Sequence, residues 1–156
     1  MAFTVTNDYI TGRNPVPTPA GAEILATRFT LALATGDLAL NTIGQIGILP
    51  AGCVPVDVRV DGADLDSGAG AGVYQIGIWD GAGANLSVAA ADGGGAWGDT
   101  GAAVATAFDK LLTRTLNNMA NVVQSQSDRK LGLKVTTAPS TAVPGTIGVT
   151  LFYKPA

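Results

Sequence analysis

Apolar residues alternate with other residues along several short segments of the chain, and a period of two is typical of half-buried β-strands. The clearest case is the segment 54–60, where valine occupies positions 54, 56, 58 and 60. Further segments with this alternation are 27–33, 43–49, 74–78, 131–135 and 147–153, with a weaker one at 86–88. Gly, Pro and Asp residues between the segments favour turns. The pattern therefore predicts seven or eight short strands.

The order of these segments predicts an all-β protein. No strand–helix–strand unit recurs, so a parallel sheet is not expected. A single-domain antiparallel β-sandwich with jelly-roll-like connections would protect the edges of so many strands. The segments 131–135 and 147–153 have matching lengths and are predicted to form an antiparallel hairpin. The length of 156 residues suits one domain.

Two stretches interrupt the strand pattern. Residues 103–123 carry apolar side chains at helical spacing, which predicts at most one short helix, over residues 103–112. Residues 89–101 are so rich in glycine that a long exposed loop is expected, because glycine loses much backbone entropy when it is ordered. Trp97 lies in this loop, and it either folds back as a plug or anchors a protein contact.

The first 25 residues predict an extended N-terminal arm, which precedes a sandwich domain at residues 26–156. Prolines at every second position fix an extended backbone that cannot pair as an inner strand. Two alternatives stay open for the arm: a disordered tail, or a strap that lies on an adjacent subunit. The residues that would make the contacts of a strap are Phe3, Val5, Tyr9, Ile10, Pro15, Pro17 and Pro19.

Composition indicates a protein that works in contact with others. Charged residues make up 13% of the chain, against roughly 25% in an average globular protein. A weakly charged surface is poorly protected against association, and only 6% of the residues are aromatic, so the core has thin layers. Both features favour self-association, and we expect a homotrimer. Nine Lys and Arg residues, spread thinly in a chain of net charge −3, argue against a nucleic-acid partner.

The residue inventory gives little support to catalysis. Histidine is absent, which removes the commonest general base and zinc ligand. Cys53 is the single cysteine, and we expect it to be a small buried apolar residue. No catalytic residue, metal ligand or cofactor is predicted, and the chain is not expected to be an enzyme. The absence of a secretion signal or an apolar run of 18 residues predicts no membrane partner and folding in the cytoplasm.

Four acids lie in or after the valine strand and are candidates for a metal or catalytic site: Asp57, Asp61, Asp64 and Asp66. Their spacing does not fit an EF-hand loop, although a calcium site built from several loops stays open as an alternative. A glycosidase pair is disfavoured because such clefts are lined with aromatic residues. The favoured interpretation is a strand that ends in two turns. The glycine-rich runs at 68–72 and 93–95 match no phosphate-binding motif and are interpreted as turns.

Two longer stretches resemble small virion structural proteins of tailed bacteriophages. The first is LATGDLALNTIGQIGILPAGCVPVDVRVDGADLDSG, followed by YQIGIWDG, and the second is DRKLGLKVTTAPSTAVPGTIGVTLFYK. The resemblance covers most of the chain after Ala26 and does not include the arm. It implies a β-sandwich or jelly-roll protein that binds the capsid surface or another part of the particle.

This resemblance leads to a specific hypothesis, with alternatives. We expect a capsid decoration or cement protein that binds the major capsid protein on the outside of the head, after synthesis in the host cytoplasm. It would stabilise the shell by bridging subunits. A tail, neck or fibre component is the first alternative. The second is a carbohydrate-binding module in which Trp79 and Trp97 form the stacking platform.

Overall fold

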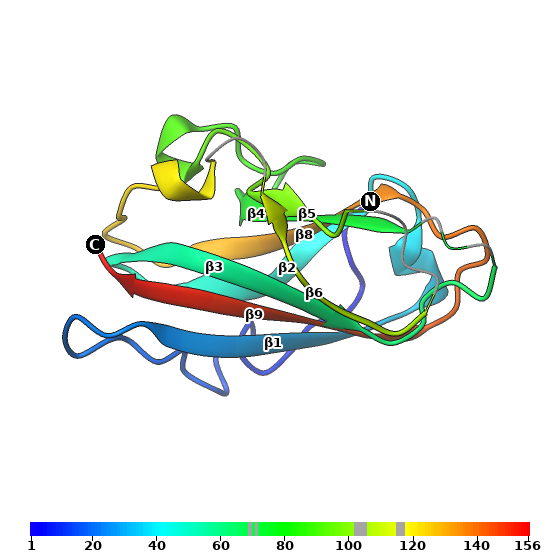
Figure 1. Ribbon diagram of the computed structural model, residues 1–156, viewed down its shortest axis with the longest axis horizontal. Coiled ribbons are helices and arrows are strands. Elements are labelled where there is room, and N and C mark those ends of the chain that lie inside the picture. The colour runs from blue at the N-terminus through cyan, green and yellow to red at the C-terminus, as the bar shows by residue number, and fades with distance from the viewer. Residues whose placement is uncertain (69, 71, 102–105, 115–117) are drawn as a thin grey trace.

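The protein is a sandwich of two antiparallel sheets, as the computed structural model shows (Figure 1). The structure describes residues 1–68, 70, 72–101, 106–114 and 118–156. The first sheet has the order β1 (Leu25–Leu33), β9 (Gly145–Pro155), β3 (Cys53–Gly62), β6 (Phe108–Leu111). The second has the order β2 (Ile43–Leu49), β8 (Arg129–Thr137), β4 (Val73–Trp79), β5 (Gly98–Asp99), β7 (Thr113–Arg114). The prediction of an all-β antiparallel sandwich is confirmed.

The connections are those of a jelly roll. Strands pair in a nested series, β1 with β9, β2 with β8, β3 with β6 and β4 with β5. Such nesting arises when one long antiparallel ribbon is rolled up into two facing sheets. The short strand β7 extends the second sheet beyond β5.

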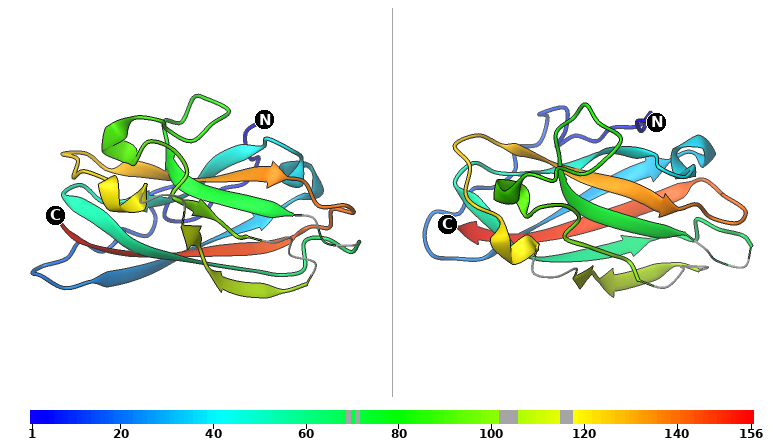
Figure 2. Two further views of the ribbon diagram at one scale, coloured as in Figure 1. Left: turned by 45° about the horizontal axis from the view of Figure 1, so that its top comes forward. Right: turned by 90° about the horizontal axis from the view of Figure 1, so that it is seen from above.

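Three short 3-10 helices complete the described fold. They are η1 (Thr35–Leu38), η2 (Ala90–Asp92) and η3 (Met119–Asn121). Both views in Figure 2 place η2 and η3 next to each other at one end of the second sheet. Among the described residues, no helix has the length and apolar character needed to cross a bilayer.

The core lies between the two sheets and is mainly aliphatic. Val58 faces Leu151 and Val60 faces Val149 across the β3–β9 pair, and all four are fully buried. Burying an aliphatic side chain of this size contributes about 1.5–3 kcal/mol relative to leaving it exposed. Cys53, at the start of β3, is also buried, as its sequence context predicts.

Some predictions about local structure are wrong. The segments 131–135 and 147–153 lie in β8 and β9, which belong to different sheets and form no hairpin. Residues 108–111, predicted as part of a helix, form β6 because they pair with residues 59–62 of β3. The start of that predicted helix, residues 103–105, lies outside the described residues. Residues 86–88 form no strand.

Candidate contact surfaces

Asp66 is a structural clamp between two loops. Its carboxylate is buried, with 1% of the residue exposed. It accepts hydrogen bonds from the backbone N–H groups of Gly68 at 2.9 Å, Ser140 at 2.8 Å and Thr141 at 2.8 Å, and from the Ser140 hydroxyl. Asp66 also forms an isolated β-bridge with Ala142. The loop after β3 is thereby tied to the connection between β8 and β9.

The other acids of the valine strand have separate partners. Asp61 binds the guanidinium of Arg28, Asp57 accepts a bond from the N–H of Val58 at 2.8 Å, and Asp64 accepts one from the N–H of Asp66 at 3.1 Å. Within the part of the chain that the structure describes, no three His, Cys, Asp or Glu residues are grouped closely enough to hold a metal. The geometry therefore favours a strand that ends in structured turns.

The N-terminal end of the arm pairs with the edge of the second sheet. Phe3 donates its N–H to the carbonyl of Ile43 at 3.1 Å, and Ile43 donates to the carbonyl of Met1 at 2.9 Å. Phe3 lies so close to Gly44 that a Cβ atom at that position would be 2.6 Å from its ring. Thr4 donates both its N–H and its hydroxyl to the buried carboxylate of Asp37.

Asn7 bridges the two sheets where their edge strands β1 and β2 lie. Its side-chain amide donates to the carbonyl of Thr30 in β1 at 3.1 Å and to that of Ile46 in β2 at 2.8 Å. Its Oδ1 atom accepts bonds from the N–H groups of Tyr9 and Ile10 at 3.1 and 3.0 Å. One side chain thus satisfies edge carbonyls of both sheets and also fixes the turn of the arm that follows.

The remainder of the arm also packs on its own sandwich. Tyr9 contacts Phe29 in an edge-to-face arrangement with ring centroids 5.0 Å apart, and the hydroxyl of Tyr153 donates to the carbonyl of Pro17 at 2.6 Å. The disordered-tail alternative is therefore wrong. Of the predicted contact residues, Phe3, Val5, Tyr9, Ile10 and Pro19 are half-buried against the same chain, whereas Pro15 and Pro17 are exposed.

The loop between β4 and β5 is fixed on the outer face of the second sheet. Gly77 of β4 and Gly132 of β8 lie opposite each other, and Leu86 packs into the space left by their missing side chains. Trp97 is fully buried. Its backbone N–H donates to the carbonyl of Ile76 at 2.8 Å, and its indole Nε1–H donates to the carbonyl of Asp92 at 2.9 Å. The plug alternative for Trp97 is confirmed, and its use as an exposed contact anchor is wrong.

Further bonds tie this loop to the segment around η3. The Nη1 atom of Arg129 donates to the carbonyl of Ala91 and to the carboxylate of Asp92, both at 3.1 Å. Val123 donates its N–H to the same Ala91 carbonyl at 2.9 Å. The expected exposed loop at 89–101 is thus ordered over most of its length, with only residues 89–91 and 94 exposed.

An exposed apolar surface remains on top of this ordered loop. We call it the Val88 surface, and it consists of Val88, Ala89, Ala90, Ala91 and Val123. Val88 is 78% exposed and Val123 is 57% exposed. Beside them is a shallow hollow of about 530 Å³ whose lining includes Ala90, Ala91 and Val123. The sequence did not indicate this surface, because nothing in it shows that residues 88–91 and 123 are adjacent.

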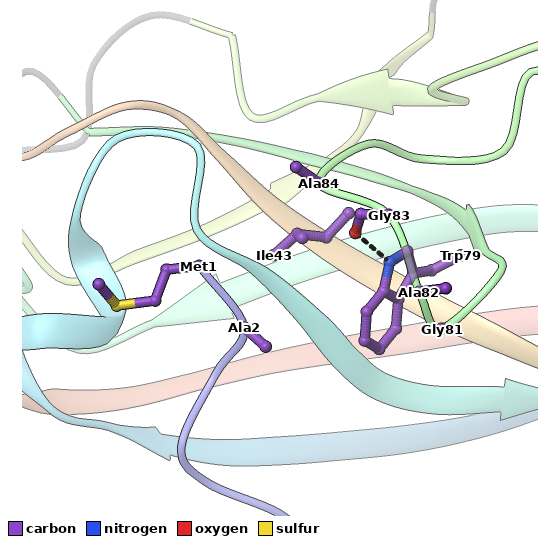
Figure 3. A pocket seen from close by; sticks show the side chains of 8 residues that line it. All are labelled: Met1, Ala2, Ile43, Trp79, Gly81, Ala82, Gly83 and Ala84. Carbon is purple, nitrogen blue, oxygen red and sulfur yellow. Dashed lines mark hydrogen bonds between the residues drawn. The ribbon is translucent and has the colours of Figure 1, made fainter.

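Trp79 lines a smaller hollow of about 240 Å³ near the N-terminus (Figure 3). Its Nε1 donates to the carbonyl of Gly83 at 3.0 Å, and the Nζ atom of Lys130 lies 5.7 Å from its ring centroid. Trp97 is buried elsewhere, so the two tryptophans cannot form one stacking platform. This removes the platform on which the carbohydrate-binding alternative depended.

The outer face of the first sheet carries two ion pairs, Arg28–Asp61 and Arg59–Asp109. The bond from Arg59 holds the pKa of Asp109 below its usual value. In the interior, burial raises the pKa of the Cys53 thiol and raises that of the Tyr74 hydroxyl to about 12. Both interior groups are therefore neutral near pH 7, as expected for packing residues.

Comparison with known proteins gives a match at the level of structure. No family model matches the sequence, and no curated protein is detectably similar to it. A chain in the capsid of Ralstonia phage GP4 superimposes with a TM-score of 0.73 at 26% identity, over 96% of both chains. This protein is similar to a bacteriophage capsid chain along nearly its whole length.

Two further structures are also from phage capsids. A chain of the cyanophage Pam1 capsid asymmetric unit has a TM-score of 0.49 and 16% identity, over 93% of this chain and 96% of that one. A chain of the acid-stable capsid of Helicobacter pylori bacteriophage KHP30 has a TM-score of 0.40 and 13% identity, over 83% and 86%.

Proposed function

We propose that this protein is a structural component of a bacteriophage virion, and specifically a capsid decoration protein on the outside of the head. The observation that carries the proposal is the whole-chain similarity to a chain in the Ralstonia phage GP4 capsid. The match includes almost all of both chains, so it does not depend on one shared motif. A structural role requires no catalytic group, which agrees with a sequence that has no histidine.

The physical role would be to hold the shell together. A protein that bridges major capsid subunits binds the assembled shell more tightly than it binds free subunits, and it stabilises the shell by that difference in free energy. At a free concentration 100 times its dissociation constant, one bound copy would contribute about 2.7 kcal/mol. Many copies on one head would add such contributions over the whole surface.

We assign the shell contact to the exposed part of the arm. Pro15 and Pro17 are exposed, and the backbone of this stretch is held in place by the bond from Tyr153 to the carbonyl of Pro17. Proline fixes its own φ angle, so an exposed proline segment loses little conformational entropy on binding. A segment that is already ordered on the sandwich can therefore contact the shell at low entropic cost.

The test is binding to capsids that lack this protein. Purified protein should sediment with such capsids and raise their melting temperature in calorimetry. The variant with Pro15→Ala and Pro17→Ala should bind more weakly and keep its own melting temperature, while Pro144→Ala, at an exposed proline outside the arm, should bind normally. Absence of wild-type binding at micromolar concentration would refute the decoration role.

Copy number separates decoration from a tail, neck or fibre position. Quantitative mass spectrometry of dissociated particles should give a fixed number of copies of this protein per copy of the major capsid protein. That number should be high enough for the protein to cover the whole head. A far smaller ratio would place the chain in the tail or neck and contradict the proposal, even if it remained a virion protein.

A further inference from the structure

The Val88 surface is rigid before it meets any partner. Leu86 and Trp97 fix the loop to the second sheet, and Arg129 holds the carbonyl of Ala91 and the carboxylate of Asp92. The bond from Val123 to Ala91 joins the two segments that make up the surface. A preorganised surface loses little entropy on association, so more of the contact energy remains as affinity.

The five side chains of this surface are all apolar. Residues 81–91 contain no ionisable side chain. Of the two acids at either end, Asp92 is bound by Arg129 and by the Ser87 hydroxyl, and Asp80 accepts backbone bonds from Ala82 and Gly83. Exposed apolar side chains on a fixed, uncharged surface are typical of a protein contact site.

We propose that the Val88 surface is the contact between copies of this chain, in the homotrimer that its composition predicts. Each copy has a net charge of −3, so two copies repel unless they meet where no unpaired carboxylate is brought together. The five side chains of the Val88 surface include no carboxylate, whereas Asp64 is exposed on another loop. Asp80 is exposed at the border of the surface, in a hollow that Val88 and Ala89 also line.

The shape of the surface also suits a second copy. It presents an exposed valine, Val88, and close to it a hollow lined by alanines and glycines of the loop together with Asn121 and Val123. The valine of one copy can enter the hollow of the next, and a repeated contact of this kind closes into a ring when the rotation between copies allows it. One surface thus supplies both halves of the contact.

The first experiment measures mass in solution. Light scattering should give the wild type a mass above that of one 15.6 kDa chain, three times as large for a trimer, and should give Val88→Asp the mass of one chain. Val88→Asp should keep the wild-type circular dichroism spectrum because Val88 is mostly exposed. The matched control is Ile24→Asp, which changes an aliphatic residue that is 57% exposed before β1 and should remain associated.

The second experiment locates the contact. Val88→Cys protein is mixed with Asn121→Cys protein and treated with a short bismaleimide, so that a link between the two new thiols must join different copies. A two-chain product is expected in this mixture and not when Ile24→Cys replaces Asn121→Cys. Cys53 is only 3% exposed and should contribute little.

Two results would overturn the inference: a wild type that stays at 15.6 kDa up to its solubility limit, or a Val88→Asp variant that remains associated. The inference goes beyond the proposed virion role and does not depend on it. A protein that associates through Val88 but binds no capsid would refute the decoration role alone, and a monomer that binds capsids would refute only the contact between copies.

Discussion

Replacing Asp66 by asparagine tests whether the acids after the valine strand are a clamp or a metal site. The Asp66 carboxylate accepts three backbone N–H bonds and one hydroxyl bond in a buried position. Asparagine has nearly the same shape but replaces one oxygen by an NH₂ group, which donates and cannot accept. At least one buried backbone N–H would then lose its acceptor and face another donor.

The expected cost follows from the number and type of bonds. A hydrogen bond to a charged group contributes about 1.5–3 kcal/mol, and a buried donor left without a partner costs about 1–3 kcal/mol. We therefore expect Asp66→Asn to lower the free energy of unfolding by about 3 kcal/mol. For a chain of this length, about 1 kcal/mol corresponds to roughly 2–4 °C, so the melting temperature should fall by roughly 10 °C.

Thermal unfolding of three proteins, each with and without a calcium chelator, separates the two explanations. Asp64→Asn is the matched control, because Asp64 is exposed and accepts a bond from the N–H of Asp66 in the same turn. A clamp predicts a large loss for Asp66→Asn, a loss below about 1 kcal/mol for Asp64→Asn, and no effect of the chelator. A wild type that the chelator destabilises, or an Asp66→Asn variant as stable as the wild type, would refute the clamp.

Three other predictions address the arm, the ordered loop and the buried thiol. Asn7→Ala removes the bonds to Thr30 and Ile46, so limited proteolysis should cut the arm faster than in the exposed-site control Asn14→Ala; equal rates would contradict the bridge. Gly132→Ala would place a Cβ atom 2.7 Å from the Cβ of Trp79 and should cost about 1–3 kcal/mol in urea unfolding, unlike Gly21→Ala, which has nothing within 4 Å. Cys53 is buried with a raised thiol pKa, so it should react with a thiol reagent only slowly until the protein unfolds; rapid reaction of the native protein would show that β3 opens at its start.

The strands could be predicted from the sequence because each alternates on its own, but their pairing could not. In the segment 54–60, the valines at 58 and 60 face the core, but those at 54 and 56 do not and are only half-buried. A register shift between Pro55 and Asp57 reverses the alternation, so Cys53 and Pro55 are the buried residues in the first half of the strand. The error over 131–135 and 147–153 arose from assuming that neighbouring strands pair. In a jelly roll, consecutive strands often lie in opposite sheets, and no local pattern encodes that arrangement. The same limit explains residues 108–111, where pairing with β3 overrides a helical spacing.

The contact surfaces were predicted less well, for a related reason. The sequence showed that Phe3 and Tyr9 had apolar area to bury, but it could not show that this area would be buried on the same chain. The ordered loop depends on Gly77 and Gly132, which are two strand positions far apart in sequence and opposite each other in space. Glycines at outward-facing strand positions were a usable signal, because they often mark close approach of another segment.

The way the sandwich protects its edges bears on how copies of the chain meet. On one side, the arm pairs with β2 and Asn7 satisfies carbonyls of β1 and β2. On the other side, β6 is an edge strand with Asp109 and Lys110 at its centre.

Two β6 strands related by a two-fold axis would pair antiparallel, with residues of the same face opposite each other. The two registers that pair most of the strand place Asp109 against Asp109 or Lys110 against Lys110, and like charges directly opposite destabilise a pair. Extension of the first sheet by pairing of β6 with β6 across a two-fold axis is therefore disfavoured. Association through side chains of a fixed, uncharged loop avoids that penalty, and the Val88 surface provides such a loop.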